Sequence, residues 1–136
     1  MTEHKGVDGR MRAWRSLWIE LGIELSFFVV LEGCVALLWR YNALLLGIAA
    51  LICVVALTRW HSRFDICFFL IIAVLGSLAE VVFVRFGGWE YANPTLLGVP
   101  IWFPVAFGAT GLIGGRLART TNAIWDKATP PGGVKR

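Results

Sequence analysis

Four long apolar stretches, separated by short polar segments, dominate the chain. They cover residues 17–38, 43–58, 66–84 and 102–117. The hydrocarbon core of a bilayer is about 30 Å thick, so a spanning helix needs about 20 predominantly apolar residues. The second stretch reaches that length only if it includes Tyr41, Asn42 and Arg59, whose long side chain can extend to the interface. The pattern therefore predicts an all-α integral membrane bundle of four transmembrane helices, near residues 16–39, 42–59, 65–86 and 102–120.

The composition favours a single transmembrane domain over residues 1–136. Hydrophobic residues make up 57% of the chain and charged residues 16%, whereas charged residues make up about 25% of ordinary soluble domains. Four spans use almost the entire length, and no phosphate-binding loop, metal cluster or nucleophile motif is present. The segments 1–13 and 127–136 are polar and contain glycine or proline, so we expect flexible ends there.

The basic residues fall almost entirely on one side of the predicted bundle. Eleven of the thirteen lysines and arginines lie in the N-terminal segment, the second turn or the C-terminal segment, and only Arg40 and Arg85 lie on the other side. Basic flanks stay in the cytoplasm, so both termini should be cytoplasmic, in the cell membrane of a bacterium or archaeon. All seven tryptophans then lie near the ends of spans, where aromatic side chains favour the interface. The net charge of +4 thus indicates orientation rather than nucleic-acid binding.

The three cysteines indicate neither a metal site nor a lipid attachment site. Cys34, Cys53 and Cys67 lie in apolar stretches without ligand-like spacing, so we expect small buried hydrophobes and neither a metal nor a cofactor. The segment that ends at Cys34 has the outline of a lipoprotein cleavage site. However, Glu20 and Glu24 interrupt the apolar core that such a signal needs, so a retained helix is the favoured interpretation.

The longest connection, residues 87–100, lies on the outer side and combines aromatic residues with spaced glycines and prolines. Trp89, Tyr91 and Trp102 could form a plain interfacial belt. The spacing of glycine and proline favours instead an ordered outer loop that folds over the mouth of the bundle, with Trp89 and Trp102 packed inward. Proline suits the first turn of a helix, so the fourth helix should begin close to Pro104.

Two carboxylates within the spans, Glu32 and Glu80, are the candidate catalytic residues. Each lies seven residues below the outer end of its span, so at 1.5 Å per residue both are about 10 Å deep. A charged residue at the centre of a spanning helix costs about 2.5–3.5 kcal/mol on insertion scales, and such residues are commonly functional. They should face the bundle interior, within reach of one another, where they could share a proton, or of Arg40 and Arg85. In the second case the four side chains would simply hold the bundle together.

Glycines in the fourth span indicate a helix-packing face. Gly111 and Gly115 form a small-xxx-small pair, and Gly108 lies near the same face. Small residues let helix backbones approach closely in lipid. The sequence leaves open whether this face packs within the bundle or against a second chain.

One segment, residues 80–104, resembles known membrane proteins. It runs Glu80, then Gly87-x-Trp89-x-Tyr91, then Gly98-x-Pro100-x-Trp102-x-Pro104. This pattern resembles a signature of small, uncharacterised multi-pass membrane proteins of bacteria and archaea. It is more distantly similar to the lycopene-cyclase-type membrane domain of carotenoid synthesis, where an acidic residue is expected soon after the second proline and this chain has Ile101 and Trp102. The resemblance therefore implies an outward-facing pocket under an aromatic loop rather than cyclase activity.

Two functions remain in view. The first is to bind or act on an apolar membrane lipid or isoprenoid-like ligand, with Glu32 and Glu80 as acid–base groups. The residues expected to bind that ligand are Trp89, Tyr91, Trp102, Arg85 and Arg40. The second is that of a non-catalytic membrane subunit, which would associate with a partner or a second copy through the glycine face of the fourth helix.

Overall fold

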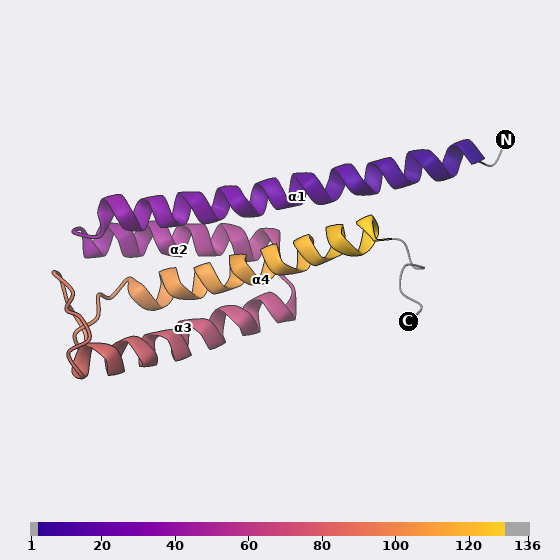
Figure 1. The fold of residues 1–136 in the computed structure, drawn as a ribbon. Coiled ribbons are helices and arrows are strands. Elements are labelled where there is room, and N and C mark those ends of the chain that lie inside the picture. Colours follow the sequence, from indigo (N-terminus) through magenta and orange to yellow (C-terminus); the bar gives the residue numbers. More distant parts are fainter. Residues whose placement is uncertain (1–2, 130–136) are drawn as a thin grey trace, which may run out of the picture.

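The chain forms four α-helices joined by two short turns and one longer loop (Figure 1). In the computed structural model, which describes residues 3–129, the helices are α1 (Glu3–Leu38), α2 (Asn42–Arg59), α3 (Arg63–Arg85) and α4 (Phe103–Ala128). The described residues contain no β-strand, and one isolated antiparallel bridge pairs Leu96 with Val99. The predicted all-α class and the predicted order of four helices are confirmed.

Helix α4 lies at the centre of the bundle. It packs against each of the other three helices, and Figure 1 shows it between the α1–α2 hairpin and α3. Its buried residues are mostly small or aliphatic: Phe103, Ala106, Gly108, Ala109, Leu112, Ile113 and Thr120. In α3 the buried residue is Asp65, so α3 presents a broad apolar surface to its surroundings.

The glycine face of α4 is covered by α3 of the same chain. A Cβ atom added at Gly111 would lie 2.6 Å from Ile72, and one added at Gly108 would lie 2.8 Å from Phe69. Side chains do not tolerate such distances, so glycine is what allows these two helices to approach so closely. Gly115 is less tightly covered, because a Cβ there would lie 3.1 Å from its nearest neighbour. Gly108 and Gly111 therefore pack within the bundle, against α3 of the same chain.

Three of the helices are long and apolar enough to cross a membrane, namely α2, α3 and the part of α1 from Met11 to Leu38. By the same measure α4 is not among them, because Arg116 and Arg119 make its C-terminal half less apolar. Large apolar side chains, such as Leu37 and Leu51, are exposed on the outer faces of the helices. Such extensive exposed apolar surface indicates a membrane protein.

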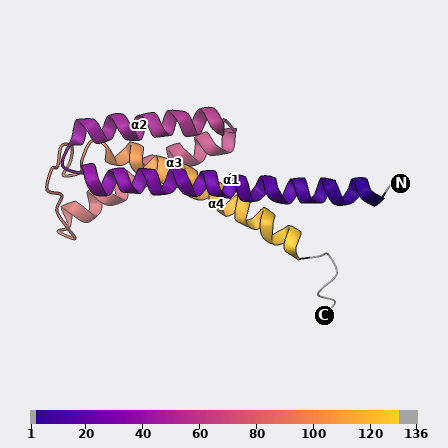
Figure 2. The same cartoon turned by 90° about the horizontal axis from the view of Figure 1, so that it is seen from above.

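Two helices are longer than the sequence predicts. Helix α1 begins at Glu3 rather than near residue 16, and α4 ends at Ala128 rather than near residue 120. Both project beyond the α2–α3 turn, and Figure 2 shows that they diverge there. The apolar pattern marks only the apolar part of a helix, and both helices continue through the more polar residues beyond it. Residues 1–2 and 130–136 of the predicted flexible ends lie outside the described part of the chain.

An ionic network joins all four helices at the end of the bundle opposite the 86–102 loop. Arg116 of α4 lies within 3.5 Å of three carboxylates: Glu20, Glu24 and Asp65. Arg59, the last residue of α2, pairs with Glu20 at 2.9 Å. A further arginine, Arg119, pairs with Asp65. Three guanidinium groups thus face three carboxylates, so the network is electrically balanced.

Glu24 is the most enclosed member of this network. Its side chain is 0% exposed, and its Oε1 accepts a hydrogen bond from the Thr120 hydroxyl at 2.8 Å. Near the middle of the same interface, Glu32 of α1 accepts a hydrogen bond from Thr110 of α4 at 3.0 Å. A residue further along α1 thus contacts a residue nearer the start of α4. The two helices are therefore antiparallel neighbours.

Candidate functional site

Residues 86–102 form a loop of defined shape over one end of the bundle, called the loop end below. Leu96 and Val99 exchange backbone hydrogen bonds of 3.0 and 2.9 Å and so close a tight turn. The two central residues, Leu97 and Gly98, have φ angles of 52° and 87°, as a type I′ turn requires. Gly87 also has a positive φ, of 74°, which suits a glycine just after a helix. These conformations agree with the predicted ordered loop.

Two asparagines tie the loop to the turn between α1 and α2. Asn42 donates a hydrogen bond to the backbone oxygen of Asn93, and Asn93 donates one to the backbone oxygen of Arg40, both at 3.0 Å. The indole N–H of Trp102 donates to Asn42 Oδ1 at 3.1 Å, and Trp102 is only 6% exposed. The predicted inward packing of Trp102 is confirmed. The role of the asparagines is not apparent from the sequence, where Asn42 is merely the end of a short turn.

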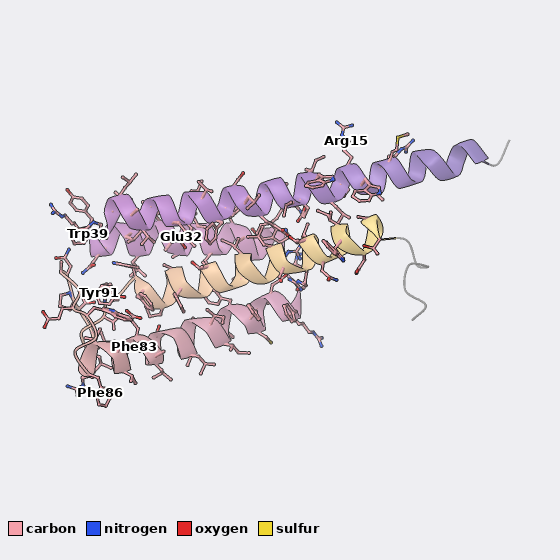
Figure 3. The ribbon with its side chains drawn as sticks, viewed as in Figure 1. Arg15, Glu32, Trp39, Phe83, Phe86 and Tyr91 are labelled. Carbon is pink, nitrogen blue, oxygen red and sulfur yellow. The ribbon has the colours of Figure 1, made fainter. Side chains whose placement is uncertain are left out.

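Glu80 lies beneath the loop and is held by two of its aromatic residues. The indole N–H of Trp89 donates to Glu80 Oε1 at 2.6 Å, and the hydroxyl of Tyr91 donates to the same oxygen. Trp89 also stacks on Phe83 with 5.1 Å between ring centroids, yet it remains 45% exposed. Figure 3 shows Phe83 and Tyr91 together at the loop end. Trp89 therefore packs against α3 with its side chain half-exposed, and the predicted inward packing of this residue is wrong.

Tyr91 acts as a neutral hydrogen-bond donor in this arrangement. Burial of the side chain and the adjacent carboxylate of Glu80 raise the pKa of the phenol above its ordinary value of 10. Its ring also meets Phe103 edge-on at 6.2 Å, which fixes its position. Within the described chain both donors reach Oε1 of Glu80, and no hydrogen bond reaches its second carboxylate oxygen.

The two candidate catalytic carboxylates have polar partners, but not the predicted ones. Glu32 bonds to Thr110, whose hydroxyl also lies 3.0 Å from the backbone oxygen of Ala106. Over residues 3–129, neither Glu32 nor Glu80 forms an ion pair or a hydrogen bond with the other, or with Arg40 or Arg85. The predicted pairings are therefore wrong. The two carboxylates are kept apart because α4 lies between α1 and α3, and the two arginines are exposed instead of turned toward the carboxylates. Figure 3 accordingly shows Glu32 along α1, away from Tyr91.

Arg40 and Arg85, both predicted to bind ligand, lie at the rim of the loop end. Both side chains are exposed. The guanidinium of Arg40 lies 5.0 Å from the ring centroid of Trp39, a cation–π arrangement. Arg40 thus contacts Trp39 and is otherwise exposed, whereas the sequence predicted that it would pair with Glu32 or Glu80.

Two mainly apolar cavities flank the loop. The α3-side cavity, of about 370 Å³, lies between α3 and the loop and is lined by residues that include Val74 and Ile101. The α1-side cavity, of about 310 Å³, is lined by residues that include Tyr91 and Trp102. Pro100 lines both. Each volume falls within the range of about 300–1,000 Å³ that is typical of small-molecule sites.

Comparisons of this chain with protein-family models, with curated proteins and with solved structures find no match. The resemblance of residues 80–104 to small multi-pass membrane proteins, and the more distant one to the lycopene-cyclase-type domain, therefore stay predictions from the sequence. The geometry of the loop end is the basis on which a function can be proposed.

Proposed function

We propose that the chain is a cell-membrane protein of a bacterium or archaeon that spans the bilayer four times, with both termini in the cytoplasm. The eleven-to-two division of lysine and arginine supports this orientation, and three helices have the length and apolarity of spans. Helix α4 would be the fourth span. Its two arginines face carboxylates of α1 and α3, which lowers the cost of placing them in the membrane. The loop end then faces outward.

We propose further that the loop end binds an apolar lipid or isoprenoid-like ligand. The observation that carries this proposal is the α3-side cavity, whose wall is almost entirely aliphatic. Inside a bilayer the hydrophobic effect does not distinguish such a cavity from lipid, so selectivity has to come from shape and from polar groups. The fixed turn at residues 96–99 supplies the shape. Glu80 and Tyr91 supply polar groups at the same end of the bundle.

Glu80 is the residue best suited to act on such a ligand. Two neutral donors fix the position of its Oε1, and its other oxygen has lone pairs that can accept a hydrogen bond from a ligand. Glu32, bonded to Thr110 between α1 and α4, is better suited to holding those two helices together. We therefore assign the acid–base role to Glu80.

The test is a mass-spectrometric search for lipid that co-purifies with the protein. Val74→Trp would fill the α3-side cavity, whereas Val82→Trp adds the same bulk on an exposed part of α3 outside that cavity. The proposal predicts that the parent protein and Val82→Trp retain an apolar ligand and that Val74→Trp loses it. Equal retention by both variants, or no selected lipid in the parent protein, would contradict the proposal.

Assembly with a membrane protein partner would need a surface other than the glycine face. Helix α3 covers Gly108 and Gly111 in the same chain, so a partner could reach them only by displacing α3. Gly111→Leu is therefore expected to disrupt the bundle itself. Loss of a partner from that variant would not identify an interface.

A further inference from the structure

The end of the bundle opposite the loop carries a polar pocket that the proposed ligand site does not use. It has a volume of about 340 Å³, and its wall includes Glu20, Arg59, His61, Ser62, Asp65 and Arg116. Two guanidinium groups and two carboxylates give this wall a net charge of zero when His61 is neutral. Arg59 ends α2 and Trp60 follows it, a combination typical of the point where a span meets the membrane interface. Pockets between helices at that level can receive lipid headgroups, as basic pockets do for anionic lipids.

Two groups on the wall have unused hydrogen-bonding capacity. The side chain of Arg59 is 50% exposed, and one of its nitrogens donates to Glu20 Oε2 at 2.9 Å. A guanidinium carries five N–H donors and a carboxylate oxygen has two lone pairs. Arg59 thus has donors to spare, and Glu20 Oε2, which takes this single bond within the described chain, can accept another. A free donor and a free acceptor lie side by side at the pocket.

We infer that this pocket binds the phosphoethanolamine headgroup of phosphatidylethanolamine. The phosphate accepts hydrogen bonds from Arg59, whose planar guanidinium matches phosphate oxygens, and from the ring N–H of His61. The ammonium donates to Glu20. Because positive and negative side chains lie side by side on the wall, it favours a zwitterionic headgroup over an anionic one. Phosphatidylcholine is also zwitterionic, but its choline group has no N–H that could donate to Glu20. The inference is independent of which face of the membrane holds the pocket and of any ligand at the loop end.

The test uses the full chain in nanodiscs of equal parts phosphatidylethanolamine and phosphatidylcholine, with mass-spectrometric analysis of the lipid that stays on the protein after release. Phosphatidylethanolamine should be enriched about tenfold over phosphatidylcholine, and Arg59→Met should bring the ratio close to one. Arg63→Met is the matched control, since it removes an exposed arginine that does not line the pocket, and it should keep the enrichment. A ratio near one in the parent protein, or equal loss in both variants, would overturn the inference.

Two further arms separate the alternatives. If phosphatidylglycerol replaces phosphatidylcholine in the mixture and is the enriched lipid, the pocket selects anions and the inference fails. Soluble phosphoethanolamine should not displace the retained lipid at equal concentration, and displacement would show a site for a free metabolite instead. If Arg59→Met does not fold, His61→Ala, whose parent side chain has no hydrogen bond in the described residues, must lower the enrichment about threefold for the inference to stand.

Discussion

Replacing Gly111 by alanine should destabilise the bundle, although alanine is the better helix former. The added Cβ would lie 2.6 Å from Cβ and Cγ2 of Ile72 and 2.7 Å from its Cγ1. An isoleucine in a helix has one strongly preferred rotamer, so these atoms cannot turn away and α3 has to shift. Overpacking of this kind costs about 1–3 kcal/mol. The gain in helix propensity, about 1 kcal/mol, offsets part of that cost.

Gly114→Ala is the matched control, because a Cβ at that position meets nothing within 4 Å. Both variants gain the same helix propensity, so the difference between them isolates the strain, and Gly111→Ala should be the less stable by about 1–3 kcal/mol. The free energy of unfolding can be measured by titrating detergent-solubilised protein with dodecyl sulfate and following helix content by circular dichroism. Equal stability of the two variants would refute the packing of α3 on this face.

Three further predictions concern the loop end. Glu80→Gln should leave the loop ordered, because an amide oxygen can still accept both hydrogen bonds, whereas Glu80→Leu should speed hydrogen exchange in residues 86–102 by about tenfold, or ~1.4 kcal/mol. Unchanged exchange in the leucine variant would argue against the role of the carboxylate. In a Tyr41→Phe background, absorbance titration should find Tyr91 largely un-ionised at pH 10, since its pKa is raised. Its contribution to stability, complete below pH 10, should be lost only as the pH rises through the raised value, and half-ionisation at pH 10 would contradict this. In a chain otherwise free of cysteine, Glu90→Cys should be labelled from outside the cell, and labelling from the cytoplasm alone would contradict the orientation.

The helices and the shape of the loop could be predicted because their signals are local. Apolar runs gave α2 at its observed bounds and placed both ends of α3 within two residues. The expected helix start near Pro104 matches α4, which begins at Phe103 with the proline in its first turn. The spacing of the glycines predicted a loop of fixed shape. Gly87 and Gly98 do adopt the positive φ angles that glycine tolerates.

The partners of the buried carboxylates could not be predicted in the same way, because they depend on how each helix is rotated. Glu24 and its partner Thr120 are 96 positions apart in the chain. Depth alone suggested arginine partners for Glu32, but depth does not say which way a side chain points, and the observed donor is Thr110. A partial signal does exist for the ionic network. Glu20 and Glu24 lie four residues apart and share one face of α1, and an arginine such as Arg116 in an apolar stretch needs a counter-ion.

The most direct test of an apolar ligand at the loop end is site-specific photocrosslinking in native membranes. A diazirine-bearing residue at Ile101 would line the α3-side cavity, whereas one at Leu75 would sit on an exposed part of α3 outside it. Mass spectrometry then identifies the lipid attached at each position. We predict that one apolar lipid or isoprenoid-like molecule dominates the adduct at position 101 and is not enriched at position 75. The same mixture of bulk phospholipids at both positions would contradict ligand binding at this site.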